Sequence, residues 1–171
     1  MKDKPYQLNL IGIIDVPLVK EAIAKIESIP PDNSSDICLM INSKGGSVPV
    51  ALTFARYLCS LPRRIVAYNA AHCDSAAIII FASAQERIAL QASSFMFHPP
   101  CVNLNGKYTL RALSVEMRRL KEDKKSVITF LSHALSLDKR HLHKWLDRGE
   151  FVFDAQQALR MGIATGIEPI L

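Results

Sequence analysis

The sequence predicts an α/β protein with a mainly parallel sheet, and two observations carry this prediction. A continuous apolar run of strand length occurs at residues 37–41 (ICLMI), which is typical of a strand covered on both faces, and residues 64–68 (RIVAY) are expected to form a second buried strand. Each run is followed by a segment with helical periodicity, at residues 48–59 and 76–84. Strands that alternate with helices at this spacing form βαβ units, so the strands are expected to run parallel.

The remaining short elements fit the same pattern. Residues 7–14 (QLNLIGII) alternate in polarity and are rich in β-forming residues, so we expect an opening strand. Pro17 is at a favourable position for the start of a helix, because proline is well tolerated in the first turn. Residues 87–90 and 95–97 are expected to form two further short strands.

A long amphipathic helix is expected from residue 110 to residue 135, where apolar residues recur at intervals of three, four and seven. Its apolar stripe thins at residues 121–125 (KEDKK). Two interpretations stay open: an ordinary covering helix, or an arm that packs on something outside the monomer. If the helix is an arm, its far end should expose an apolar patch formed by Val127, Ile128, Phe130 and Leu131.

Composition limits the class of protein. The 171 residues, 49% hydrophobic and 22% charged, suit one domain over residues 1–171 and exclude a disordered chain. The longest apolar run, residues 76–84, is too short to cross a bilayer, so no membrane partner is expected. No basic segment followed by an apolar one opens the sequence, so we expect a cytoplasmic protein.

The net charge of +5 raises the question of nucleic-acid binding. Residues 107–148 hold 11 Lys and Arg against 5 Asp and Glu, which concentrates the basic excess on one helical, polar stretch. A solvated helix face explains this better than a nucleic-acid partner. The four cysteines form no CxxC pair, so no metal site is expected.

Three features could carry hydrolytic chemistry. Gly45-Gly46 follows a buried strand and could offer backbone N–H groups to an oxyanion, although a tight turn would look the same. Ser75 heads a predicted helix, where it could be a nucleophile or a helix cap. His98 ends a short strand, where it could be a general base or a polar terminus.

The order and spacing of these features resemble a known family. INSKGGSV at residues 41–48, Ser75 at 29 residues after Gly46, SSFMFH at residues 93–98 and FDAQQALRMGIA at residues 153–164 are similar to the Clp protease proteolytic subunit (ClpP) family. The resemblance runs over about residues 8–167. It implies a ClpP/crotonase-type spiral of ββα units with a protruding handle helix, the handle being residues 99–135.

The resemblance also implies roles for single residues. Ser75 matches the nucleophile and His98 the general base, while Gly46 and Ala76 match the donors of the oxyanion hole. Asp147 is our choice for the acid that orients the histidine, with Asp154 and Asp138 as alternatives. No metal or other cofactor is implied.

The implied function is that of a serine endopeptidase of ClpP type, which cleaves peptides or unfolded proteins inside an oligomeric chamber by a Ser-His-Asp mechanism. Implied partners are further copies of the chain in stacked rings and an ATPase unfoldase. The alternative is a catalytically weak or inactive ring subunit, favoured by Asp74 before the serine and by Ala77 in place of a glycine. A crotonase-type acyl-CoA enzyme would share the core but would have no use for Ser75 paired with His98.

Overall fold

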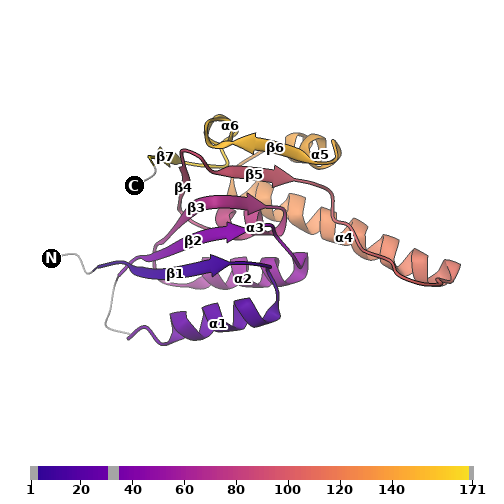
Figure 1. Cartoon of the computed structure of the whole chain (residues 1–171), viewed down its shortest axis with the longest axis horizontal. Helices are drawn as coiled ribbons and strands as arrows, with labels where there is room; N and C mark the ends of the chain where they lie inside the picture. The colour runs from indigo at the N-terminus through magenta and orange to yellow at the C-terminus, as the bar shows by residue number, and fades with distance from the viewer. Residues whose placement is uncertain (1–3, 31–34, 170–171) are drawn as a thin grey trace.

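The computed structural model describes residues 4–30 and 35–169 and forms a mixed α/β fold with a seven-stranded sheet. Strands and helices alternate through the first half of the chain, and a long helix follows two further strands in the second half (Figure 1). In chain order the elements are β1 (Tyr6–Ile11), α1 (Val16–Glu27), β2 (Ile37–Ser43), α2 (Val48–Ser60), β3 (Ile65–Asp74), α3 (Ala76–Ala82), β4 (Glu86–Leu90), β5 (Ser94–Phe97), α4 (Leu110–Ala134), α5 (Lys139–Leu146), β6 (Phe151–Asp154), α6 (Ala155–Arg160) and β7 (Gly166–Glu168).

The sheet is parallel except at one pair of strands, as the sequence predicts. Its main path runs β1-β2-β3-β4-β7, and β5 and β6 extend it from the far half of β3. β3 pairs with β4 through residues 66–69 and with β5 through residues 72–74, so it divides between two neighbours. The antiparallel pair is β5 with β6. Because β3 and β5 are parallel, their carboxyl ends lie at the same edge of the sheet.

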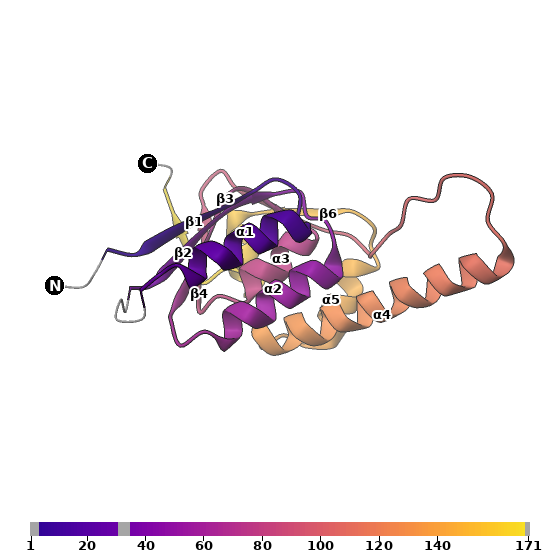
Figure 2. The ribbon, with the colours of Figure 1, turned by 90° about the horizontal axis from the view of Figure 1, so that it is seen from below.

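The core lies between the sheet and the helices that cover one of its faces. β2 alternates strictly between buried and half-buried residues, so one face of this strand points into the core. α1, α2 and α3 cover that face (Figures 1 and 2). Every residue of α3 is buried, which explains why its sequence is apolar all round rather than amphipathic.

β3 is longer than the sequence predicts, and this difference matters for the site. The strand expected at residues 64–68 continues to Asp74 in the structure, so β3 leads directly into Ser75. Its second half is held by pairing to Ser43 of β2 and to residues 94–96 of β5. These partners are far away in the sequence, so the local pattern does not reveal the extension.

The handle projects, but from the opposite end to the one we expected. Val127, Ile128 and Leu131 are buried against the core, and Phe130 is half-buried, so the prediction that they form an exposed patch is wrong. The outer handle, residues 99–120, instead extends away from the core (Figure 2). Its exposed apolar side chains are Val102, Leu104, Tyr108, Leu110, Leu113, Val115 and Met117. No helix among the described residues is long and apolar enough to cross a membrane.

Candidate active site

Ser75 occupies the turn between β3 and α3 in a backbone conformation that non-glycine residues rarely adopt. Its φ is 54° and its ψ −121°, and its N–H donates to the Met96 carbonyl of β5 at 2.7 Å. Such a conformation is strained and persists where the surroundings impose it. The serine does not act as a helix cap, because its side chain accepts no capping hydrogen bond. A sharp strand-to-helix turn of this kind presents a hydroxyl outward from the sheet edge.

Gly45 and Gly46 form a turn that packs directly behind the serine. A Cβ added at Gly45 would lie 2.7 Å from the Asp74 carbonyl oxygen and 2.8 Å from the Cβ of Ser75, distances that no side chain tolerates. A Cβ at Gly46 would lie 2.4 Å from the Ile14 carbonyl oxygen. Both glycines have positive φ, so close approach and backbone conformation each require glycine here.

The Gly45-Gly46 turn also lies against the start of α3. The Cβ position of Gly45 is 3.0 Å from the nitrogen of Ala76, so the turn touches the first residue of α3. N–H groups in the first turn of a helix have no intrahelical acceptor. Among the described residues, no backbone hydrogen bond uses the N–H of Gly46 or that of Ala76. Both groups are therefore free to donate to a ligand.

His98 follows β5 at the same edge of the sheet and is half-buried. Its Nδ1 lies 2.7 Å from the carbonyl oxygen of Pro99. A histidine whose Nδ1–H donates to a carbonyl has its Nε2 free to accept a proton. No hydrogen bond joins His98 to Ser75 in the part of the chain that the structure describes.

Ser75 and His98 line two cavities together. One is small, about 20 Å³, and has apolar walls that include Ile79, Phe97 and Leu146. The other, about 370 Å³, is open and includes Lys44, Gly46, Ser47 and Asp123. Asp123 comes from the polar middle of α4, which the sequence analysis assigned to a solvated face, and burial raises the pKa of its carboxyl. The pair thus lies between an apolar pocket and a polar groove.

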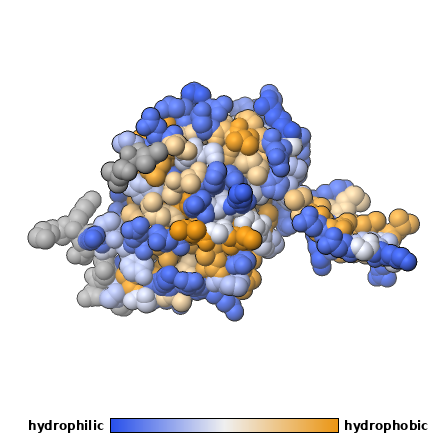
Figure 3. Space-filling model, in the orientation of Figure 1, coloured by the Kyte–Doolittle hydropathy of each residue, from blue (hydrophilic) through white to orange (hydrophobic). Residues whose placement is uncertain are grey.

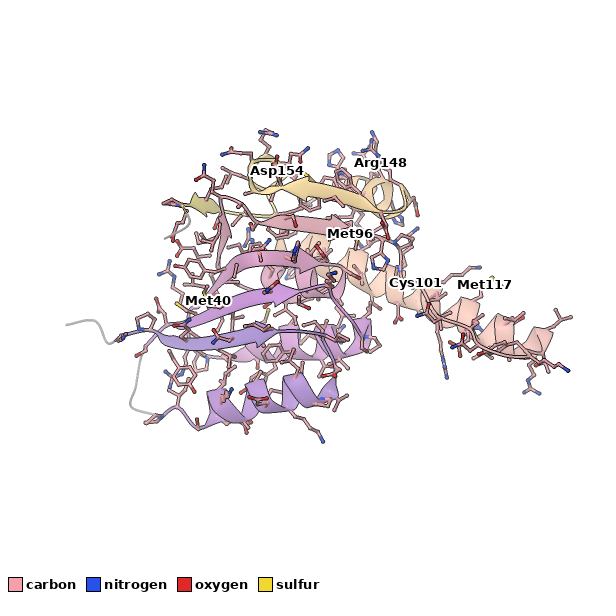
Figure 4. All side chains as sticks on the ribbon, viewed as in Figure 1. Met40, Met96, Cys101, Met117, Arg148 and Asp154 are labelled. Carbon is pink, nitrogen blue, oxygen red and sulfur yellow. The ribbon has the colours of Figure 1, made fainter. Side chains whose placement is uncertain are left out.

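Among the described residues, none of the carboxylates chosen from the sequence forms a hydrogen bond or ion pair with His98. Asp147 ends α5 and forms an ion pair with Lys124 of α4. Asp154 caps α6 and accepts from the Gln157 N–H at 2.7 Å. It pairs with Ser94, four residues before His98, or about 13 Å along the strand. Figure 4 shows Asp154 and Arg148 at opposite ends of β6. Asp138 caps α5, and its bonds to Arg140 lower its pKa to about 2.

The structure points to a carboxylate that the sequence analysis did not consider. β5 and β6 pair in register up to Phe97 opposite Phe151. If the register continued one residue beyond the two strands, Glu150 would lie opposite His98. Directly opposed residues of an antiparallel pair have Cβ atoms about 5 Å apart. Glu150 is exposed, and none of the ion pairs found among the described residues uses it. The sequence analysis did not consider Glu150 because it did not predict β6 as a strand.

Asp74 directly precedes Ser75 and is 8% exposed, which is unusual for a residue with an ionisable side chain. Burial raises the pKa of its carboxyl, and the positive charges of His72, Lys44 and His98 oppose that rise. Among residues 4–30 and 35–169, no three His, Cys, Asp or Glu side chains lie close enough together to hold a metal ion.

A strained serine between strand and helix, with a histidine at the end of the adjacent parallel strand, is typical of α/β hydrolytic proteins. Comparison with known sequences identifies one family within this class. The sequence profile of the family described as Clp protease matches residues 6–169, nearly the whole described chain, so the chain belongs to the Clp protease family. The predicted family and fold class are thereby confirmed.

Curated relatives agree with this assignment at low identity. ATP-dependent Clp protease proteolytic subunit 1 of Rhodopirellula baltica is 29% identical over 156 residues, which cover 89% of this chain and 67% of the relative. The ATP-dependent Clp protease proteolytic subunit of Borreliella afzelii is 27% identical over 163 residues, covering 92% of this chain and 80% of the relative. Subunit 1 of Borreliella burgdorferi is also 27% identical, with 81% of its length covered.

The raised pKa of Asp74 predicts a pH-dependent cost to stability. As pH rises above the ordinary carboxyl value, the unfolded chain ionises first, so the free energy of unfolding falls until the folded pKa is passed. Asp74→Asn should therefore raise the thermal midpoint at pH 7, and the gain should shrink toward pH 4. Thermal denaturation between pH 4 and 8 measures this. Glu27→Gln, on an exposed position of α1, is the control; a gain equal at all pH values would contradict the argument.

Proposed function

We propose that this chain is a serine endopeptidase of ClpP type, which cleaves peptides or unfolded proteins within a chamber built from several copies. The observation that carries the proposal is the strained Ser75, backed by the Gly45-Gly46 turn and sharing two cavities with His98. The strained conformation has a clear use if the hydroxyl must face a substrate. Membership of the Clp protease family supports the same reaction class.

In the proposed mechanism, the Oγ of Ser75 attacks the carbonyl carbon of the scissile peptide while His98 Nε2 takes the hydroxyl proton. The N–H groups of Gly46 and Ala76 donate to the oxyanion that forms. His98 then gives its proton to the leaving amine. In the second half of the reaction His98 takes a proton from a water molecule that attacks the acyl carbon, and it returns that proton to the Oγ of Ser75 as the acid product leaves. Before attack, the Ser75 hydroxyl must come within hydrogen-bond reach of His98 Nε2.

For the residue that orients His98, we favour Glu150 over Asp147. The register of β5 and β6 supports Glu150, whereas Asp147 would first have to leave its ion pair with Lys124. The Pro99 carbonyl already fixes the ring of His98 through Nδ1. Glu150 would add a negative charge close to the imidazolium that forms during the reaction, which a carbonyl alone does not supply.

The outer handle supports assembly into stacked rings. Leu110 is 85% exposed and Met117 55%, and with Leu113 they follow the spacing of one helix face. Figure 3 shows apolar residues gathered along the arm, and Figure 4 labels Met117 there. A projecting apolar stripe is costly in water and is typical of an interface. Because the relatives are named ATP-dependent, we also propose an ATPase partner that unfolds larger substrates.

Replacing the nucleophile tests the reaction. Ser75→Ala should lower kcat/KM for peptide hydrolysis by about 1,000-fold or more, because the triad acts as a unit. Hydrolysis of fluorogenic peptides and labelling by a fluorophosphonate probe measure this, and Ser60→Ala, an exposed serine at the end of α2, is the control. Unchanged hydrolysis in Ser75→Ala would exclude the mechanism. An unlabelled wild-type protein would favour the inactive ring subunit.

Two isosteric substitutions separate the candidate acids. Glu150→Gln should lower kcat about 100- to 10,000-fold with little change in KM, since the imidazolium loses its negative partner. Asp147→Asn should leave kcat within about twofold, as expected for an exposed ion pair. Glu150→Asp should recover part of the rate, which a purely structural role would not predict. Loss in Asp147→Asn with full activity in Glu150→Gln would return the role to Asp147.

Charges on the outer handle should separate stacked rings. The double variant Leu110→Glu/Met117→Glu places two carboxylates in the proposed interface, so single rings or smaller species should replace the larger assembly. Light scattering coupled to gel filtration gives the mass. Arg119→Glu, on the opposite side of the same helix, is the matched control. A wild-type protein that stays monomeric at all concentrations would contradict the assembly.

A further inference from the structure

Asp74 is the only buried Asp or Glu among residues 4–30 and 35–169, and its carboxyl has no partner there. It is 8% exposed, and none of the hydrogen bonds or ion pairs among the described residues uses its side chain. An ionised group that leaves water without gaining a partner destabilises the fold. Residues of this kind are typical of functional sites, where activity is gained at the expense of stability.

The pairing of β3 with β5 sets Asp74 close to His98. Asp74 is opposite Met96 in this parallel pair, and His98 follows Met96 by two residues. Neighbouring strands are about 4.8 Å apart and two residues span about 7 Å, so the Cα atoms of Asp74 and His98 are at most about 12 Å apart. Burial raises the pKa of the Asp74 carboxyl, and the positive charge of His98 is among those close enough to oppose that rise.

We propose that Asp74 is a positioning residue for the reaction, whose carboxylate stabilises the imidazolium of His98 that forms when Ser75 attacks the substrate. The inference rests on the proposed function, because it adds a second negative charge to the same mechanism. Asp74 touches neither the substrate nor the reacting atoms in this role. It acts through His98, and the fold is less stable as a result.

The sign of the effect follows from reciprocity. Because the positive imidazolium of His98 favours the ionised form of Asp74, ionised Asp74 favours the imidazolium by the same free energy. The imidazolium forms when the Oγ of Ser75 gives its proton to His98 Nε2. The interaction with the carboxylate is therefore stronger during the reaction than before it, and an interaction that strengthens in this way lowers the barrier.

Four other charged or titratable groups face this pair of side chains from the neighbouring elements: His72 of β3, Lys44 after β2, Asp123 of α4 and, by the proposal above, Glu150 before β6. The charges of His72 and Lys44 balance part of the charge of Asp74, so we expect a moderate effect on the rate. None of the four changes when Asp74 alone is substituted. A comparison of the variant with wild type therefore isolates the action of Asp74 on His98.

The same carboxylate could instead oppose the oxyanion, which is also negative. The Gly45-Gly46 turn meets Asp74 through its backbone carbonyl, whose oxygen is 2.7 Å from the Cβ position of Gly45. The carboxyl of Asp74, by contrast, interacts with the charge of His98. This difference favours an action on His98. The two effects have opposite signs, so the rate of a variant without the charge decides between them.

The experiment follows kcat/KM for a fluorogenic peptide from pH 5 to pH 9. Asp74→Asn should lower the plateau about fivefold to tenfold, because the imidazolium loses a nearby negative charge. The acid limb, along which the base becomes neutral, should move to lower pH by about half a pH unit or more. The thermal midpoint should rise, as derived above. A residue that only supports the fold would instead lose activity and stability together.

Asp36→Asn is the matched control, since it removes the same charge from the start of β2. Asp36 is eight residues before Lys44, or about 26 Å along the strand, so the limb and the plateau should keep their wild-type values. Asp74→Ala removes the charge without adding an amide and should move the limb as Asp74→Asn does. Asp74→Glu keeps the charge and should return the limb to its wild-type position, with part of the rate.

The pH dependence of fluorophosphonate labelling of Ser75 gives a second readout that does not depend on peptide turnover, and its acid limb should move in the same way. A wild-type protein that is labelled, with a limb that Asp74→Asn leaves in place, would overturn the inference and leave the proposed function standing. A higher rate in Asp74→Asn would also overturn it, in favour of the action on the oxyanion. No labelling and no hydrolysis in wild type would overturn both proposals.

Discussion

The close approach of the Gly45-Gly46 turn to the backbone around Ser75 is the constraint on which the site depends. A single added Cβ at Gly45 would meet the carbonyl of Asp74 and the side chain of Ser75 below 3 Å. The turn and the serine therefore hold each other in place, and the strained φ of Ser75 is maintained by backbone contacts on both sides. The proposed nucleophile Ser75 and the proposed oxyanion donors Gly46 and Ala76 belong to the segments that meet at this contact.

β3 pairs with two different strands, and this division explains how His98 comes to follow the strand beside Ser75. Its first half pairs with β4 inside the main sheet, while its last residues pair with β5. The bond from the Ser75 N–H to the Met96 carbonyl continues this second pairing beyond the strand end. His98 follows two residues later, so a parallel register of only three residues sets the separation of the two groups. β6 pairs antiparallel with β5, which places the residue before β6, the proposed Glu150, near the end of β5 that leads to His98.

The two ends of α4 lie in opposite environments, one in the core and one in water. Val127 and Leu131 are buried in the core, and Val127 also lines the small cavity, whereas Leu110 and Met117 leave apolar surface in water. The polar residues 121–125 mark the boundary between these halves, and Asp123 there faces the groove while Lys124 binds Asp147. One helix thus contributes to the fold, to the site and to the surface proposed for assembly.

The sequence by itself determined the α/β class, the order of the first eight elements and the positions of Ser75 and His98, because apolar periodicity and glycine turns are local signals. Only the tertiary structure decided that β3 reaches Asp74, that Asp147 pairs with Lys124, and that β6 pairs with β5 up to Phe151 opposite Phe97. It also decided which half of α4 is buried, since periodicity finds an apolar stripe without saying what covers it. These features depend on strand register and on contacts between segments far apart in the chain, which no local pattern records.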